Sequence, residues 1–214
     1  MEIGIVAGAP ETEIQIPTYY QAKLKWIGVD EGTLTLLAHH ITPQIAIGDF
    51  DSISRDKIQQ LKQKVKHILQ YDAHKDKTDL ELAIDEALNH SPHTIYFWGV
   101  TGGRLDHELI NIQLLYKLRQ KGVRGIIINE SNWVEVKLPG TYEITQGDYD
   151  YISFLPLSME VSGLTLDNFF YPLQDATVPL GSSLCTSNKL IGKKGTFSFR
   201  DGILIVVKSR DVLG

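Results

Sequence analysis

Two aspartates separated by one residue follow a short apolar run in the first quarter of the chain. The run is 45–48, and Asp49 and Asp51 come directly after it. Alternate residues of a strand share a face, so both carboxylates can lean into one opening at its end. Two carboxylates a few ångströms apart repel by roughly 4 kcal/mol at an effective dielectric near 20, so a proton, a basic partner or a divalent cation must offset the charge. Magnesium commonly takes one or two carboxylates together with substrate phosphates. The pair indicates a phosphate-transfer site, with a plain polar turn as the alternative.

Three more polar clusters follow predicted strands. They are Asp30, the pair Asp76 and Asp79, and the group Arg104, Asp106 and His107. The carboxyl ends of parallel strands face one crevice, so we expect all four clusters to meet there. Each cluster also has a structural alternative. Asp30 can cap the helix that follows it, the helix dipole favours acids such as Asp79 and Asp106 in a first turn by roughly 0.3–1 kcal/mol, and His107 can be a helix-surface residue.

A glycine pair ahead of a predicted helix is typical of an anion cradle. Gly102 and Gly103 offer free backbone N–H groups beside Arg104, although a glycine pair also makes plain turns. The sequence has neither a Walker P-loop nor a G-x-G-x-x-G fingerprint. A nucleotide would therefore bind through a carboxylate-held metal, Arg104 and backbone amides. No Ser/His/Asp or Cys/His constellation suggests a covalent nucleophile, which favours direct in-line transfer.

Strand-like and helix-like segments alternate through the first 128 residues. The predicted strands are 3–7, 26–30, 45–48, 65–69, 94–98 and 125–128, and the predicted helices are 33–40, 55–64, one after Thr78 and one from 105 to Gly122. Thr78 and Glu81 form a T-x-x-E capping box. Leu105 and Leu109 open the apolar stripe of the last helix. Strands that alternate with helices indicate a mostly parallel sheet with helices on both faces.

Beyond residue 129 the pattern becomes that of strands. Residues 134–138 alternate apolar and polar side chains, and no convincing helix follows Gly122. Asp201-Gly202 between the runs 197–199 and 203–207 predicts a hairpin. We therefore expect an α/β domain over residues 1–129 and a smaller all-β, sandwich-like domain over residues 130–214.

The β half also offers side chains for binding a flat ring. Tyr171 could stack on a heteroaromatic ring, and Ser187 and Asn188 could hydrogen-bond to its edge. The alternative is an ordinary polar loop with a core tyrosine.

Composition sets the class of the protein. Of 214 residues, 43% are hydrophobic and 22% charged, and the net charge is −5 without a Lys/Arg cluster, which argues against a nucleic-acid partner. The single cysteine, Cys185, excludes an intrachain disulfide and fits a reducing compartment. No apolar run approaches the ~20 residues that span a bilayer. We expect a cytoplasmic protein with no membrane contact.

The assembled motifs resemble those of the bacterial thiamine pyrophosphokinases. The matching segments are 28–32 (GVDEG), 47–52 (IGDFDS), 76–83 (DKTDLELA), 102–108 (GGRLDHE), 171–177 (YPLQDAT) and 186–188 (TSN). Each motif is weak by itself, but six in the same order are highly specific. They span nearly the whole chain, and the family's α/β-then-β organisation agrees with the predicted boundary.

The resemblance implies that a diphosphate passes from ATP to the hydroxyethyl group of thiamine, giving thiamine diphosphate and AMP. It implies that the protein is a homodimer, with thiamine held between the α/β domain of one subunit and the β domain of the other. The residues implied for Mg²⁺ and the triphosphate are Asp49, Asp51 and Asp79; those for the nucleotide and its crevice are Asp30, Asp76, Thr78, Gly102, Gly103, Arg104 and Asp106; and those for thiamine are Tyr171, Ser187 and Asn188.

Our hypothesis is that magnesium bridges Asp49, Asp51 or Asp79 to the triphosphate while the thiamine hydroxyl attacks the β-phosphorus in line. Arg104 and the metal would stabilise the transferring group, and which aspartate accepts the hydroxyl proton stays open. One rival is an aspartate-nucleophile phosphatase, which also begins from D-x-D but needs a downstream lysine and a late acidic pair in α/β context. Another is a catalytically silent sensor of thiamine or a nucleotide.

Overall fold

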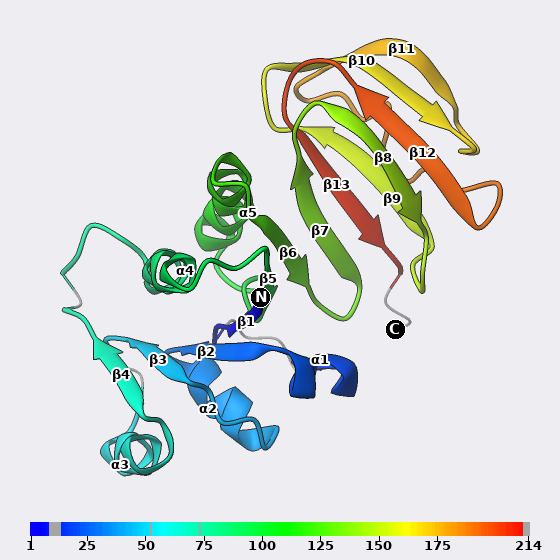
Figure 1. The fold of residues 1–214 in the computed structure, drawn as a ribbon. Coiled ribbons are helices and arrows are strands. Elements are labelled where there is room, and N and C mark those ends of the chain that lie inside the picture. The colour runs from blue at the N-terminus through cyan, green and yellow to red at the C-terminus, as the bar shows by residue number, and fades with distance from the viewer. Residues whose placement is uncertain (9–13, 52, 73, 212–214) are drawn as a thin grey trace. The chain divides into compact units, whose positions relative to one another are not determined.

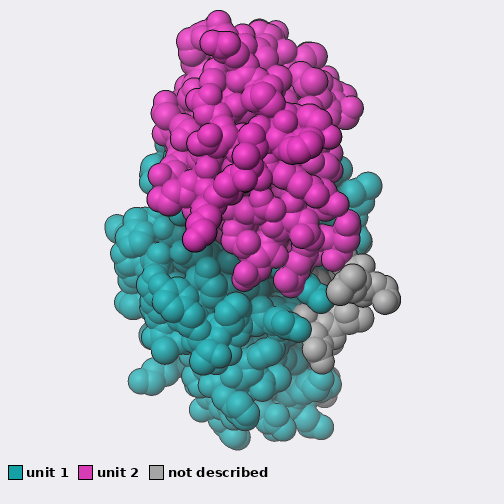
Figure 2. Space-filling model, turned by 90° about the vertical axis from the view of Figure 1, so that its right-hand side faces the viewer, with its two compact units in different colours: residues 1–130 teal, residues 131–214 magenta. Residues whose placement is uncertain are grey.

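The structure, a computed structural model, describes residues 1–8, 14–51, 53–72 and 74–211. The chain forms two compact units, residues 1–130 and residues 131–214 (Figures 1 and 2). No helix in the described residues is long and apolar enough to cross a bilayer.

A parallel sheet forms the centre of the first unit. Its strands in the described residues are β1 (Glu2–Val6), β2 (Lys25–Val29), β3 (Ile45–Gly48), β4 (His67–Gln70), β5 (Thr94–Trp98) and β6 (Arg124–Ile128). Their order is β4-β3-β2-β1-β5-β6, and each neighbouring pair is parallel. The order reverses between β1 and β5, because the chain builds outward from β1 in one direction and then returns to add β5 on its other side. Open parallel sheets bind ligands at such a switch point, outside the carboxyl ends of the strands.

Helices cover both faces of this sheet (Figure 1). They are α1 (Thr18–Lys23), α2 (Glu31–Ala38), α3 (Arg55–Lys64), α4 (Asp79–Asn89) and α5 (Leu105–Gln120). Gly28 of β2 faces Thr33 of α2, whereas Gly125 of β6 faces Leu115 and Leu118 of α5 on the opposite side. The predicted α/β class with a mostly parallel, helix-flanked sheet is confirmed.

The apolar stripe predicted for the last helix is wrong. Leu105 and Leu109 of α5 are 68% and 52% exposed. The buried side chains of this helix include Leu114, Leu115 and Leu118, nearer its C-terminus. The helix packs on β6 through its later turns, so the apolar residues of its first turns remain at the surface.

The second unit consists of antiparallel strands. Its elements are β7 (Asn132–Lys137), β8 (Gly140–Thr145), β9 (Tyr151–Pro156), β10 (Glu160–Asp167), β11 (Leu173–Pro179), β12 (Lys194–Phe199) and β13 (Leu204–Ser209). Strand β13 pairs with β7 and β9, and the order β11-β10-β12-β8 makes the second sheet. Phe154 of β9 and Val206 of β13 share a core with Leu166 of β10 and Phe197 of β12, as in a sandwich. The all-β, sandwich-like class predicted for this half is confirmed.

The predicted hairpin at Asp201-Gly202 does not form. Strand β12 pairs with β8 and β10, whereas β13 pairs with β7 and β9. Gly202, at φ +99°, turns the chain between two sheets, and Asp201 forms an isolated bridge with Ser162. The chain does turn at these two residues, but the strands they join face each other across the core.

Candidate active site

A cavity of about 640 Å³ lies in the first unit, at the carboxyl ends of its strands. Ala7, Gly8, Gly99 and Val100, which follow β1 and β5, line it at the switch point. The charged and polar lining residues come from the loops after β2, β3, β4 and β5, from the start of α2 and from the N-terminal halves of α4 and α5: Asp30, Glu31, Asp49, Lys75, Asp76, Lys77, Thr78, Asp79, Arg104, His107, Glu108 and Asn111. All four predicted polar clusters therefore contribute to one opening.

Asp30 points into this opening and does not cap α2. Its backbone has φ +45°, its side chain makes no capping bond, and its Oδ1 accepts a hydrogen bond of 3.3 Å from the Phe50 N–H. Burial, and then the negative charges of Asp79 and Asp49, raise the pKa of Asp30 to about 6 against the opposing effect of the Phe50 N–H. A Cβ at Gly48 would lie 1.7 Å from Asp30 Oδ1, so only glycine fits beside this carboxylate.

Asp49 and Asp79 share one ammonium group. Lys75 Nζ lies 2.9 Å from Asp79 Oδ1 and 3.8 Å from Asp49 Oδ2. The sum of these distances is the upper limit on the separation of the two oxygens. Asp79 Oδ1 is buried and has no hydrogen-bond partner besides this ion pair. Burial lowers the pKa of Lys75, but its bond to Asp79 and the charges of Asp79, Asp49 and Asp30 raise it on balance, so the group stays protonated.

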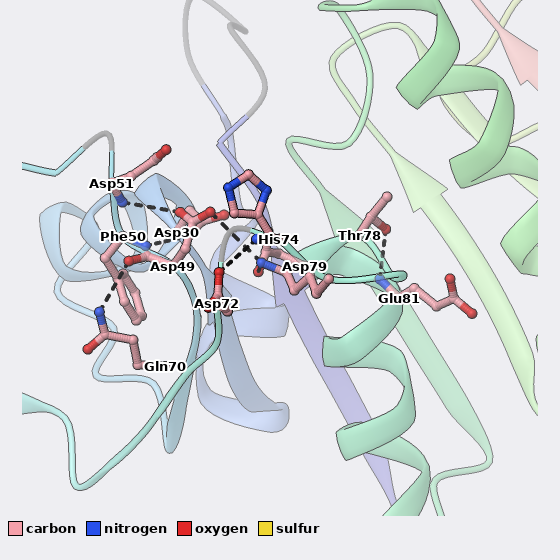
Figure 3. A network of polar contacts seen from close by, with 11 residues as sticks. Asp30, Asp49, Phe50, Asp51, Gln70, Asp72, His74, Thr78, Asp79 and Glu81 are labelled. Atoms are coloured by element: carbon pink, nitrogen blue, oxygen red, sulfur yellow. Dashed lines mark hydrogen bonds and ion pairs between the residues drawn. The ribbon is translucent and has the colours of Figure 1, made fainter.

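Asp51 is beside this cluster but not inside it. Its backbone N–H donates to Asp49 Oδ1 at 3.1 Å, while its carboxylate is exposed and directed away from Asp30 and Asp49 (Figure 3). It does not line the cavity. Ser52, the last residue of its motif, lies outside the described residues.

The carboxylates have the oxygen chemistry that magnesium prefers. Among the residues that the structure describes, no group of three or more His, Cys, Asp or Glu side chains could hold a metal ion. Asp49 and Asp79 nevertheless present oxygens toward one positive charge, and one of those oxygens is buried. Such a pair fits a cation bound by two carboxylates and completed by phosphate oxygens.

Half of the predicted capping box forms at α4. The Glu81 N–H donates to Thr78 Oγ1 at 3.2 Å, whereas the Glu81 carboxylate pairs with Lys117 of α5 instead of returning to Thr78 (Figure 3). This cap fixes the first turn of α4 and with it Asp79. Asp76, two residues before the cap, is exposed and lines the cavity.

The predicted anion cradle already holds an anion from the chain itself. Glu108 Oε1 accepts hydrogen bonds from the N–H groups of Gly102, at 3.0 Å, and Gly103, at 2.9 Å. Beside it, Asp106 takes two hydrogen bonds from the Arg104 guanidinium, at 3.1 and 2.6 Å. The pair holds the pKa of Asp106 below its usual range. Both of these side chains are exposed, so the guanidinium is oriented but open to solvent.

The three ring-binding candidates lie together in the second unit. Tyr171 is 60% exposed and stacks edge-on against Phe170, with ring centroids 5.0 Å apart. Asn188 is only 2% exposed, and its amide is used internally: it accepts from Tyr171 N–H at 3.0 Å and donates to Tyr171 C=O at 2.8 Å. Ser187 has φ +57°, and its N–H donates to Ser153 Oγ. Asn188 therefore holds the Tyr171 backbone, which sequence reasoning did not foresee.

Lys75, Glu108 and Asn111 also shape the cavity and were missed in the sequence. Lys75 stands four residues before Asp79, a spacing that could have suggested an ion pair with it, and Glu108 is an acid just after a glycine pair. Asn111 is buried in the middle of α5 and donates to Val100 C=O at 2.8 Å, but an isolated asparagine carries no pattern.

Comparisons with known proteins cover both units. A family model described as the catalytic domain of thiamin pyrophosphokinase matches residues 16–127, and one described as its vitamin B1 binding domain matches residues 141–204. A thiamine pyrophosphokinase of Bacillus subtilis is 45% identical over 211 residues, which are 98% of this chain and 99% of that one.

Solved structures agree with these matches. A crystal structure of thiamine pyrophosphokinase from Bacillus subtilis superposes with a TM-score of 0.93 at 44% identity and covers 99% of this chain and 100% of that one. One from Geobacillus thermodenitrificans gives a TM-score of 0.89 at 40% identity, with 99% of this chain and 98% of that one covered.

Proposed function

The chain belongs to the thiamin pyrophosphokinase family, and from this membership we propose how its own residues carry out the family's reaction. That reaction moves the pyrophosphoryl group of ATP to thiamine, giving thiamine diphosphate and AMP. The observation that carries the proposal is the convergence of Asp30, Asp49 and Asp79 around the Lys75 ammonium in a cavity at the sheet's switch point.

We assign Asp49, Asp51 and Asp79 to a Mg²⁺ site. The buried Asp79 oxygen and the nearby Asp49 carboxylate support the assignment most directly, and Asp51 would complete the set by turning its exposed carboxylate toward its neighbour Asp49. When bound, Mg²⁺ would neutralise charge on the phosphates and polarise the reacting phosphoryl group.

The phosphate tail of ATP is bound by groups from the loop before α5. Arg104, held by Asp106, would pair with phosphate oxygens, because a guanidinium matches them with two parallel hydrogen bonds. The N–H groups of Gly102 and Gly103 bind the Glu108 carboxylate, which supports their use as anion donors, and a phosphate oxygen would take the place of Glu108 there.

The remaining polar groups orient the reaction. Asp76 and Thr78 line the cavity beside the acidic cluster, where they would contact the nucleotide. The thiamine hydroxyl attacks the β-phosphorus in line and AMP leaves, while an aspartate of the cluster accepts the hydroxyl proton. Positioning and charge neutralisation supply most of the acceleration in such transfers.

Thiamine would be held by the second unit. The match to a vitamin B1 binding domain covers Tyr171, Ser187 and Asn188, and the exposed tyrosine ring can stack on a flat heterocycle. Asn188 would act by holding Tyr171 in place. We propose that the protein works as a homodimer in which the cavity of one subunit faces the ring-binding residues of the other. The single free cysteine, Cys185, fits action in the reducing cytoplasm.

The nucleotide product tests this function. The protein is incubated with ATP, Mg²⁺ and thiamine, and the products are separated by chromatography. We expect AMP and thiamine diphosphate in equal amounts. ADP would indicate an ordinary kinase, a trapped phosphoryl group on Asp49 would indicate a phosphatase mechanism, and tight binding without AMP would indicate a sensor.

A further inference from the structure

We propose that Lys75 is a positioning residue whose ammonium group and the divalent cation compete for the same two carboxylates, Asp49 and Asp79. The inference rests on the proposed function, because it concerns how Asp49 and Asp79 are held together before Mg²⁺ binds and what Mg²⁺ must displace to bind them. It gives a role to a side chain that neither the sequence motifs nor the assigned reaction uses.

The geometry of Lys75 is that of a bridging cation. Its Nζ lies within 4 Å of an oxygen from each carboxylate, and those oxygens come from different segments, one after β3 and one from the first turn of α4. The side chains of all three residues are largely buried: 15% of Lys75 and 20% of each aspartate is exposed. A pair of carboxylates this shielded needs a nearby positive charge.

The charge balance of the cluster makes the competition necessary. Asp30 interacts electrostatically with both Asp79 and Asp49, and Lys75 interacts with all three. Two cations cannot occupy the space between Asp49 and Asp79 without strong repulsion. A divalent ion that binds there must therefore displace the ammonium, which can swing on its flexible stem toward the cavity it lines.

The loop that carries Lys75 offers a matched control. Lys77 has the same charge and lines the same cavity, but its Nζ pairs with Asp85 Oδ2 at 2.7 Å. Removing either lysine changes the net charge equally. A difference in Mn²⁺ affinity between the two variants therefore reports the contact of Lys75 with Asp49 and Asp79, and not the loss of one positive charge from the cavity.

Binding of Mn²⁺ to the nucleotide-free protein tests the proposal. Free Mn²⁺ is measured by electron paramagnetic resonance in a titration of the full chain. We expect Lys75→Gln to bind Mn²⁺ about tenfold more tightly than the unchanged protein, because the competing charge is gone, and Lys77→Gln to change the affinity less than about threefold. If Lys75 only held the two carboxylates together, Lys75→Gln would weaken Mn²⁺ binding, because the carboxylates would separate. Unchanged or weaker Mn²⁺ binding by Lys75→Gln would overturn the proposal.

A second variant keeps the test decisive if Lys75→Gln fails to fold. Lys75→Arg retains the positive charge, and its guanidinium can engage both carboxylates through several N–H groups, so we expect it to be displaced less readily and Mn²⁺ to bind at least about threefold more weakly. Equal or tighter Mn²⁺ binding by Lys75→Arg would contradict the competition.

The proposed function and the role of Lys75 can fail separately. The absence of AMP from reactions of the unchanged protein would remove the proposed function whatever the Mn²⁺ data show. Formation of AMP together with unchanged Mn²⁺ affinity in Lys75→Gln would leave the function in place and remove only the role of Lys75.

Discussion

Backbone geometry decides where the central carboxylates of the cavity lie. Asp30 is turned inward by a backbone with φ +45°. The missing side chain of Gly48 leaves room for its Oδ1, which accepts a hydrogen bond from the Phe50 N–H. Asp79 is fixed by the Thr78 cap at the start of α4. These constraints are local, so they can be tested one residue at a time.

Gly48→Ala should damage the site and the fold together. The new Cβ would lie 1.7 Å from Asp30 Oδ1, so the carboxylate must move. We expect a loss of about 1–3 kcal/mol in the free energy of unfolding, as for other overpacked positions, and at least a tenfold lower kcat. Gly192→Ala is the control, because nothing lies within 4 Å of a Cβ there. Equal kcat values in the two variants would show that the Asp30 position is not critical.

Asp49→Asn and Asp51→Asn separate two carboxylates that look alike in the sequence. We expect Asp49→Asn to lower kcat at least about a hundredfold with an unchanged melting temperature, because it removes transition-state charge stabilisation rather than packing. A loss of the same size in Asp51→Asn would mean that its exposed carboxylate turns into the site during turnover. Near-normal activity in Asp51→Asn would remove this residue from the metal set.

The sequence predicts which residues line the cavity better than it predicts how their side chains are oriented. Asp30, Asp49 and Asp79 were expected at one crevice because they follow strands, and they line one cavity. The orientation of Asp51 and the placement of Glu108 against Gly102 and Gly103 depend on loop dihedrals and on the packing of α5, which residue types alone do not fix.

Helix α4 is tied to α5 by an ion-pair network, and this network keeps the walls of the cavity together. Lys117 of α5 contacts Glu81 at 2.9 Å and Asp85 at 3.0 Å, both on α4, and Lys77 also reaches Asp85. Burial raises the pKa of Asp85, but its hydrogen bonds to Lys77 and Lys117 outweigh that effect and lower the pKa below its ordinary value. The network therefore makes stability depend on pH.

Lys117→Met should reveal that dependence. A carboxyl with a depressed pKa stabilises the fold above its unfolded-state pKa, near 3.9, and loses this contribution as pH falls through the lower folded-state pKa. We expect the variant to lose about 0.5–1 kcal/mol of unfolding free energy at pH 7, since the pairs are partly solvent-exposed. The difference should shrink below pH 4. Urea unfolding at pH 7 and pH 3 measures it, and a constant or growing difference toward low pH would contradict the network.

The buried Asn188 should matter through the segment that it holds. Asn188→Ala leaves Tyr171 N–H and C=O and Lys189 N–H without this partner, so we expect a loss of about 1–3 kcal/mol in unfolding free energy and a higher KM for thiamine. Tyr171→Ala removes an exposed ring and should raise that KM with little loss of stability. If Asn188→Ala were as stable as the unchanged protein, the hydrogen bonds of Asn188 to Tyr171 and Lys189 would not contribute to stability.

Element types were predictable where the pattern is local. The capping box at Thr78 locates α4, and the apolar runs before the acidic clusters locate strands of the parallel sheet in the first unit. Strand pairing in the second unit was not predictable, because Asp201-Gly202 has the composition of a hairpin turn and yet joins strands of two different sheets. Which strands pair is decided by the shared core, whose members come from strands β8 to β13 and the loops between them.

Under the proposed function, the two substrates bind to different parts of the chain. The acidic cavity belongs to residues 1–130 and the ring-binding residues to residues 131–214. If the working site combines these parts from two subunits, each defect can be compensated by a partner that carries the other.

Mixing two variants with complementary defects, assayed at a thiamine concentration well below the KM of Tyr171→Ala, tests this arrangement. Asp49→Asn removes a carboxylate proposed to hold Mg²⁺, and Tyr171→Ala removes the ring proposed to stack on thiamine. After dissociation and reassociation together, about half of the dimers are mixed, and each mixed dimer has one intact composite site. We expect diphosphate transfer to return to about a quarter of the unchanged protein's rate. Recovery no greater than the sum of the two separate variants would mean that each subunit works alone.

The fate of the β-phosphate of ATP distinguishes diphosphate transfer from transfer of the terminal phosphoryl group alone. In a single turnover with excess protein, Mg²⁺, thiamine and ATP labelled with ³²P at the β position, the label should leave the nucleotide completely and appear in thiamine diphosphate, with unlabelled AMP as the other product. Asp49→Asn, folded as judged by its melting temperature, should leave the label in ATP. Label retained in ADP, or transfer by Asp49→Asn at the rate of the unchanged protein, would contradict diphosphate transfer at this acidic cavity.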